Sequence, residues 1–171
     1  PALANTAPSV PDAGAMRDDG SIVDVLVVYT PSARAAVGGT VAMSALIDLA
    51  ISETNSGYAN SGVNHRVRLV NKTEVTYTEQ DFSSDLDNIT GTTDGYMDNV
   101  HALRDQYGAD EVVPIIDDST SCGVAWLMTT VSTSFASHAF AVVHHDCATG
   151  YYSFAHEIGH VVQRHSLRMV L

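Results

Sequence analysis

The chain has 171 residues, of which 45% are hydrophobic, and this is enough for the core of one domain. Its 20 acidic residues outnumber the 8 lysines and arginines, and the net charge is -12 with histidine neutral. This charge argues against a nucleic-acid or anionic-membrane surface, because phosphate groups would repel it. The longest apolar run lies within Ile22–Tyr29, far short of the roughly 20 residues of a transmembrane helix. We expect a monomer that contacts neither nucleic acid nor membrane.

Residues 1–20 are rich in Pro, Ala, Asp and Gly and show no hydrophobic periodicity, which predicts a disordered or processed tail. We predict a single domain from residue 21 onwards. No signal peptide is visible, because the tail has neither a basic start nor an apolar centre. If the protein is secreted, we expect its export segment to have been removed from this sequence.

Strands and helices alternate along the rest of the chain. Apolar runs predict strands over 22–29, 65–78, 112–116, 123–128 and 138–144. Helical spacing predicts helices over 41–58, 97–107 and 153–163, the second ended by Gly108. The segment 81–95 is polar and rich in turn residues, and Pro114 weakens its strand because proline cannot donate to a ladder. This order favours a mixed α/β sheet with helices on its faces. One parity of the second strand carries apolar residues that we expect on one face: Val67, Leu69, Val75 and Tyr77.

The sequence contains two cysteines, Cys122 and Cys147. In an acidic chain with a single lysine they fit the disulfide of a secreted, extracellular protein. The alternative is a pair of reduced thiols in a cytosolic protein. In the chain-entropy model, a disulfide that closes this loop contributes about 3.5 kcal/mol to stability.

The segment Phe154–His160 contains the pattern His-Glu-x-x-His. In a helix, His156 and His160 lie one turn apart on the same face, so both imidazoles can bind one metal ion at roughly 2.0–2.1 Å. Glu157 lies beside them and is placed to accept a proton from water. The apolar residues of this segment form another face of the helix: Phe154, Ile158, Val161 and Val162. The alternative interpretation is a surface helix with two solvated histidines and a carboxylate.

These residue types predict a zinc-dependent endopeptidase. A zinc ion held by neutral imidazoles activates water, and Glu157 then serves as the general base in peptide hydrolysis. The expected cofactor is one catalytic Zn²⁺, and the expected partner is a protein or peptide substrate. Neither serine nor cysteine has to act as a nucleophile in this mechanism.

Four stretches make the sequence similar to a known family: Val23–Ala36, His101–Asp110, Ser121–Met128 and Ser153–His160. They resemble the metzincin zinc metallopeptidases, specifically the reprolysin-like group and its bacterial peptidyl-Asp metallopeptidase relatives. The resemblance implies an α/β (α+β) fold like the N-terminal subdomain of metzincins. Its expected parts are a mixed five-stranded sheet with an antiparallel edge strand, two large helices and the active-site helix.

The resemblance also implies that the edge strand binds the substrate backbone by strand addition. The residues that would do so are Gly123, Val124, Ala125 and Trp126. An equally open alternative is that the apolar side chains of this stretch are simply core, and the two faces could also share the two roles. The peptidyl-Asp likeness suggests acidic substrates, for which three otherwise solvated arginines are candidates: Arg66, Arg68 and Arg104.

The third zinc ligand departs from the family pattern. Metzincins have a glycine three residues after the second histidine and a histidine three residues later, where this chain has Gln163 and Ser166. His165 is one residue early, and in a continuous helix it would point away from His156. We name it as the third ligand on condition that the backbone leaves the helix before it. The alternative is an exposed or capping histidine.

The resemblance further implies a C-terminal subdomain with a methionine-containing turn, whereas the sequence given ends at Leu171. We therefore expect residues 21–171 to be a metallopeptidase catalytic domain without its C-terminal subdomain. The alternative function is a truncated, catalytically inactive zinc-binding fragment or pseudo-peptidase. A non-catalytic protein-binding module that uses the same edge strand is a third hypothesis.

Other polar residues have weaker predicted roles. His144 and His145 look like a metal cluster, but neighbours in a strand point to opposite faces, so we expect neither to be a ligand. Asp146 could hydrogen-bond a ligating imidazole. Asp117 and Asp118 could bind Ca²⁺, although a solvated acidic pair is the simpler interpretation.

Overall fold

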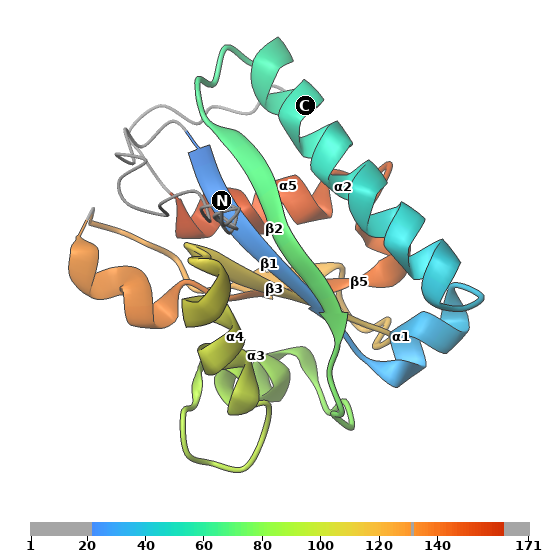
Figure 1. Ribbon diagram of the computed structural model, residues 1–171. Coiled ribbons are helices and arrows are strands. Elements are labelled where there is room, and N and C mark those ends of the chain that lie inside the picture. Colours follow the sequence, from blue (N-terminus) through green and yellow to red (C-terminus); the bar gives the residue numbers. More distant parts are fainter. Residues whose placement is uncertain (1–21, 131, 163–171) are drawn as a thin grey trace, which may run out of the picture.

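The computed structural model describes residues 22–130 and 132–162. Its centre is a five-stranded sheet with the strand order β2-β1-β3-β5-β4 (Figure 1). The strands are β1 (Ile22–Tyr29), β2 (Arg66–Glu74), β3 (Glu111–Ile116), β4 (Gly123–Ala125) and β5 (Ala141–His144). Neighbouring strands are parallel except β4, which runs antiparallel to β5 at one edge. The predicted mixed sheet with an antiparallel edge strand is confirmed.

Helices cover both faces of the sheet (Figure 1). The long α2 (Thr40–Asn60) and the shorter α5 (Ser153–Val161) pack on one face, and α1 (Pro31–Ala36) leads from β1 into α2. On the other face lie α3 (Phe82–Thr90) and α4 (Asn99–Tyr107), and α4 ends at Gly108 in the left-handed conformation, as predicted. Two 3-10 helices flank β5: η1 (Thr133–His138) and η2 (His145–Cys147). None of the helices in the described residues is both long and apolar enough to cross a membrane.

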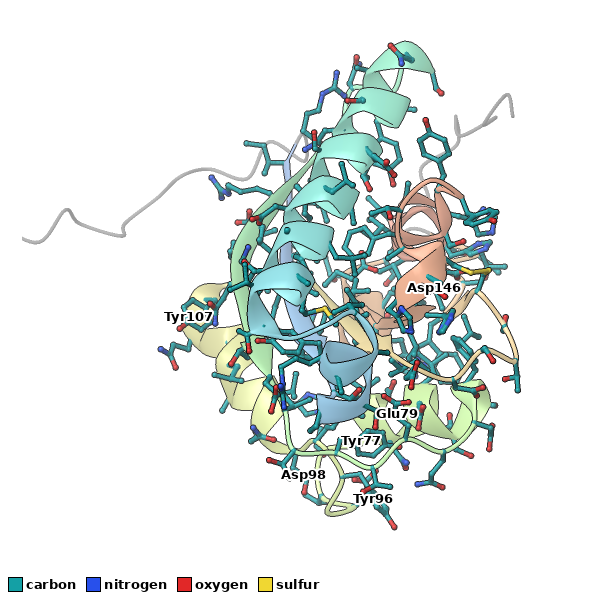
Figure 2. All side chains as sticks on the ribbon, turned by 90° about the vertical axis from the view of Figure 1, so that its right-hand side faces the viewer. Tyr77, Glu79, Tyr96, Asp98, Tyr107 and Asp146 are labelled. Atoms are coloured by element: carbon teal, nitrogen blue, oxygen red, sulfur yellow. A yellow bond between two sulfur atoms is a disulfide. The ribbon has the colours of Figure 1, made fainter. Side chains whose placement is uncertain are left out.

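β1 supplies side chains to two cores, one on each face of the sheet. Val25 and Val27 pack under α2 and α5, whereas Leu26 and Val28 pack under α3 and α4. A strand that is covered on both faces has no solvent-exposed face, which explains why β1 is an almost unbroken apolar run. At the margin of the second core, the buried Tyr77 meets the exposed Tyr96 edge to face, with ring centroids 6.3 Å apart (Figure 2).

A bulge in β2 overturns the prediction that the apolar residues of 65–78 share one face. Val25 pairs with Leu69 and Leu26 with Asn71, so Val70 is an extra residue. An extra residue reverses the side-chain alternation beyond it. Val67 and Leu69 therefore face the core under α2, whereas two later residues face the opposite core: Val75 and Tyr77.

β3 is a central strand despite Pro114. Five consecutive residues pair with β1, among them Pro114 opposite Val28. Toward β5 the ladder consists of Ile115 and Ile116, with an isolated bridge from Val112 to Phe140, so it skips the proline. This interruption is what a residue without an N–H requires.

The helix α3 was not predicted, because 81–95 was interpreted as turn-rich. Asp81 caps the helix and accepts hydrogen bonds from the backbone N–H groups of Ser83 and Ser84. Its apolar stripe is short but regular, with three buried residues at helical spacing: Phe82, Leu86 and Ile89. The polar residues between them hid this period.

A disulfide joins Cys122 to Cys147, as the extracellular interpretation predicted. It connects the residue before β4 to the last residue of η2. The backbone N–H of His144 also donates to the carbonyl of Cys122, at 3.0 Å. The start of the edge strand is therefore fixed by a disulfide to the end of η2 and by a hydrogen bond to the end of β5.

Candidate active site

The helix α5 presents its histidines to solvent because its apolar residues face the sheet. Phe154 and Ile158 are fully buried in the core that also contains Val113 of β3. On the opposite face His156 is exposed and His160 is half-buried. The structure thus separates an apolar face from a histidine face, as the periodicity of this segment predicted.

The two histidines converge. Their Nε2 atoms are 2.9 Å apart, and the rings meet edge to face with centroids 4.5 Å apart. Two nitrogens bound to one tetrahedral zinc ion at 2.0–2.1 Å would be separated by about 3.3 Å. The two Nε2 atoms therefore have to move apart by only a few tenths of an ångström to bind one zinc ion. Burial, together with the neighbouring His156, lowers the pKa of His160, which favours the neutral form that a metal needs.

The described residues supply no third ligand to this pair. In the ranges 22–130 and 132–162, no additional His, Cys, Asp or Glu forms a three-ligand group with His156 and His160. The predicted ligand His165 falls outside the described residues, together with the departures at Gln163 and Ser166.

Glu157 is buried, with 7% of its surface exposed, although the preceding His156 is exposed. Its side chain lies against Gly123 of the edge strand, where any side chain would collide with it. Burial raises the pKa of Glu157 from its ordinary 4.5 to about 7. A carboxylate with this pKa is suited to accept a proton near neutral pH.

Two hydrogen bonds hold α5 from different sides. The hydroxyl of Tyr58, at the end of α2, donates to the carbonyl of Ala155 at 2.9 Å. The backbone N–H of Met128, just after β4, donates to the carbonyl of His160 at 3.0 Å. One bond precedes the first histidine and the other involves the second, so together they set the position of the histidine face.

The edge strand β4 leaves alternate backbone groups free of β5. The carbonyl of Cys122 and the N–H of Trp126 bond toward the β5 segment, to His144 and Phe140. Because bonding directions alternate along a strand, Gly123 and Ala125 direct their N–H and C=O groups to the outer side. This is the geometry that an added strand requires.

The side chains of β4 and the residue after it point alternately to the two sides of the sheet. Val124 and Trp126 pack on the core under α3, and the indole N–H of Trp126 donates to Thr90 Oγ1 at 2.8 Å. Gly123 and Ala125 belong to the opposite side, which faces α5. The apolar residues of this stretch are thus core on one face, and the face above the histidine helix is small and open.

The arginines proposed for acidic substrates lie elsewhere. Arg66 and Arg68 are on β2, at the opposite edge of the sheet, and Arg68 pairs with Asp24 at 2.6 Å. Arg104, on α4, donates to backbone carbonyls, including that of Ala136. None of the three lies beside α5 and β4.

Sequence reasoning also missed Glu111. It opens β3, is fully buried, and neither of its carboxylate oxygens has a hydrogen-bond partner among the described residues. Burial raises the pKa of Glu111 well above its ordinary value. The Arg104 guanidinium lowers this pKa, and the carboxylates of Asp110 and Glu157 raise it. The one signal was an acidic residue at the start of an otherwise apolar strand.

Comparisons with known proteins identify the relatives of this chain. The chain is 46% identical over 140 residues to the peptidyl-Asp metalloendopeptidase of Stenotrophomonas maltophilia, an alignment that covers 81% of this chain and 32% of the relative. It is 45% identical to the protein of that name from Xanthomonas campestris pv. campestris, with the same coverage. The relative from Pseudomonas aeruginosa is 33% identical over 154 residues. The chain spans about a third of the length of the first two relatives.

A solved structure described as a chaperone-substrate complex has a TM-score of 0.64 at 19% identity, covering 82% of this chain and 25% of that chain. At this identity the likeness shows the fold alone. The family model described as Metallo-peptidase family M12 matches residues 19–163, which include the whole sheet and α5. The chain therefore belongs to metallopeptidase family M12.

Proposed function

We propose that this chain carries the catalytic helix and the substrate-binding edge strand of a zinc-dependent endopeptidase. The observation that supports this most directly is the geometry of α5 beneath β4. Two imidazole nitrogens converge at 2.9 Å on an open face, and the carboxylate between them in sequence is buried against the edge strand.

In this proposal His156 and His160 hold zinc, with His165 as the third ligand. The donor set supports the assignment, because neutral imidazoles are ordinary zinc ligands and an exposed face leaves room for substrate. When bound, zinc supplies a Lewis acid that polarises a peptide carbonyl and acidifies water. The chain's own residues do the rest of the chemistry.

Glu157 acts as the general base. It accepts a proton from the attacking water and delivers it to the leaving amine, so the carboxylate is regenerated in each cycle. The close approach of Gly123 fixes where that carboxylate can lie. Gly123 and Ala125 bind the substrate backbone as an added strand, which passes the reacting bond over α5.

The substrates are proteins or peptides, and the shared name of the relatives supports cleavage beside an acidic residue. An extracellular location is part of the proposal, because a disulfide persists in oxidising compartments.

The test is hydrolysis of casein by the protein before and after removal of metal by a chelator. We expect activity that is lost with the metal, restored by Zn²⁺, and lowered at least a hundredfold by Glu157→Gln. Asp87→Asn, at an exposed acid on α3, is the matched control and should retain full activity. Hydrolysis that survives both the chelator and Glu157→Gln would remove the proposed mechanism.

An inactive zinc-binding chain is the second candidate function. It is favoured by the presence of only two ligands on α5 within the described residues. Tightly bound Zn²⁺ that is lost on His156→Ala and His160→Ala, in a preparation without turnover, would support it, whereas measurable turnover by the same preparation would exclude it. Loss of this α5-bound zinc in a His165→Ala variant would assign the third ligand in either case.

A further inference from the structure

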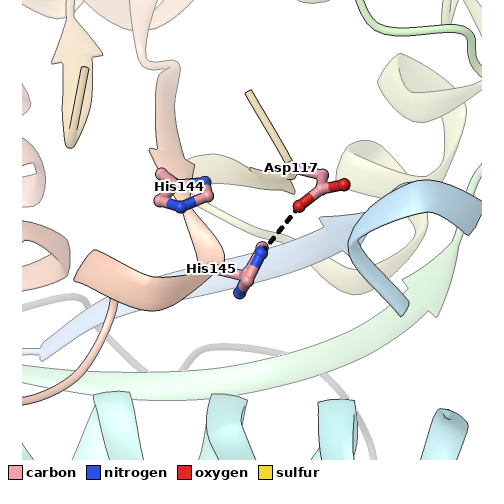
Figure 3. A group of neighbouring side chains, drawn as sticks. All are labelled: Asp117, His144 and His145. Carbon is pink, nitrogen blue, oxygen red and sulfur yellow. Dashed lines mark hydrogen bonds and ion pairs between the residues drawn. The ribbon is translucent and has the colours of Figure 1, made fainter. Parts of the chain in front are cut away.

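Three side chains that can bind metal meet at the carboxyl ends of β3 and β5, outside the histidine pair of α5 (Figure 3). Asp117 follows β3 directly, His144 is the last residue of β5, and His145 is the first residue of η2. Ile116 pairs with His144 in the parallel ladder, so both strands end at the same level. One ligand atom from each of the three residues lies within 4.8 Å of the others.

The two histidines do not point to opposite faces, contrary to the prediction from strand geometry. The chain leaves β5 at His144 and turns into η2 at His145, so the alternation of a strand ends between them. Their ring centroids are 4.4 Å apart and the rings are tilted by 52°. The turn brings both imidazoles to the same side.

Both imidazoles are buried and incompletely bonded. His144 is 6% and His145 is 7% exposed, and the Nδ1 atom of each has no hydrogen-bond partner among the described residues. The Nδ1 atom of His145 approaches Asp146 Oδ1 to 3.0 Å, but without the direction of a hydrogen bond. Buried polar atoms nearly always have a hydrogen-bond partner, so these two buried Nδ1 atoms without one indicate that an ion or water binds there.

Carboxylates surround the imidazoles. Asp117 Oδ1 lies 2.8 Å from His145 Nε2, and Asp146 Oδ2 lies 3.9 Å from His144 Nε2. Glu79 accepts a hydrogen bond from the backbone N–H of Asp117 at 3.0 Å, and Figure 2 shows Glu79 and Asp146 on the same side of the molecule. This negative charge favours a cation, and carboxylates beside imidazoles orient them for ligation.

We propose that Asp117, His144 and His145 bind a divalent transition-metal ion such as Zn²⁺, at a site separate from the active-site helix. Two imidazoles and one carboxylate suit zinc, whereas calcium takes six to eight oxygen ligands. Two ligand atoms of a tetrahedral zinc ion lie about 3.3 Å apart, so atoms separated by up to 4.8 Å have to approach each other by as much as about 1.5 Å. The disulfide at Cys122 and Cys147, which flanks the histidines, holds this segment in place.

Asp118 does not take part in the site. Its carboxylate accepts hydrogen bonds from the backbone N–H and the hydroxyl of Thr120, each at 2.9 Å. The two acids, for which a calcium site was only the less simple interpretation, are therefore divided: Asp117 contacts His145, and Asp118 bonds to Thr120 in its own turn. Asp118→Asn is the matched control for Asp117→Asn.

The experiment uses the full chain with the α5 pair removed by His156→Ala and His160→Ala. After treatment with chelator, binding of Zn²⁺ is measured by equilibrium dialysis with metal analysis, and binding of Co²⁺ by its visible spectrum. We expect one equivalent of bound metal, and a loss of at least tenfold in affinity on adding Asp117→Asn but not Asp118→Asn. Far-UV circular dichroism checks that each variant is folded.

The proposal is overturned if the α5 double variant binds no metal, or if Asp117→Asn binds it as tightly as the control. Asp117 is partly exposed, with 43% of its side chain accessible, so Asp117→Asn is compatible with folding. Neither outcome depends on peptide hydrolysis. Failure of this site and failure of the proposed peptidase function are therefore distinguishable.

Discussion

Gly123 lies against the general base proposed here: a Cβ atom at this position would be 2.7 Å from both Cγ and Oε1 of Glu157. Such a distance is far inside van der Waals contact, so the Glu157 side chain would have to move. The glycine of the edge strand thus determines where the carboxylate of the helix can lie.

Gly123→Ala should lower kcat for peptide hydrolysis at least tenfold, because it displaces Glu157 from the reacting water. Zinc binding should stay unchanged, since the nearest atoms that a Cβ at Gly123 would meet belong to Glu157 and not to the imidazoles. Gly57→Ala is the control, because a Cβ there meets the Tyr152 ring at an ordinary 3.4 Å. An unchanged kcat in Gly123→Ala would contradict the prediction, because it would show that the Glu157 carboxylate keeps its catalytic position when a Cβ atom is added.

The metal-free chain should lose stability as pH rises from about 4.5 to 7. Burial raises the pKa of Glu157 to about 7, so over this range the unfolded chain gives up a proton that the folded chain keeps. The contribution of Glu157 to the free energy of unfolding therefore falls through this window and levels off above it. Urea titrations of the chelator-treated protein at several pH values measure the slope, which should be smaller in Glu157→Gln. An identical slope in that variant contradicts the assignment.

Glu111→Gln should stabilise the chain at pH 8. Burial raises the pKa of Glu111 well above its ordinary value, so the same linkage applies and the cost of keeping the carboxyl neutral grows with pH. A buried group of this kind costs roughly 1–3 kcal/mol, and the gain should be much smaller near pH 4.5, the ordinary pKa at which the unfolded carboxyl is half protonated. Chemical denaturation at the two pH values tests this, and a variant less stable than wild type at pH 8 would refute it.

Replacement of both Cys122 and Cys147 by serine should lower the free energy of unfolding by about 2–4 kcal/mol. The disulfide closes a loop with a sequence separation of 25 residues, and its loss enlarges the conformational entropy of the unfolded chain. Adding a reductant should lower the free energy of unfolding of the wild type by the same amount, and it should leave that of the double variant unchanged. Equal stability of the oxidised and reduced wild type would mean that the bridge is not formed in solution.

The sequence was sufficient where a residue's neighbours along the chain determine its environment. The apolar run of β1 and the two faces of α5 follow from local periodicity, and both are confirmed. The period of α3 was also present, because Asp81 is a helix cap and Phe82 and Leu86 are one turn apart. Polar residues between them concealed it.

The sequence was insufficient where contacts join distant elements. Gly123 meets Glu157 because β4 runs over α5, and Asp117 meets His145 because β3 and β5 end at one level. No spacing along the chain encodes these approaches. The bulge at Val70 is similar, since a single extra residue reverses a parity that looks continuous in the sequence.

Through the hydrogen bond from the Tyr58 hydroxyl to the Ala155 carbonyl, a residue outside the His-Glu-x-x-His segment influences the position of the two histidines. The tyrosine belongs to the long helix, 97 positions earlier in the chain, so a substitution there changes the support of the helix that carries the proposed zinc ligands without replacing any residue of that helix. Tyr58→Phe is the smallest such adjustment. Natural variants of this domain that differ at this position are the first place to look for altered geometry at the imidazoles.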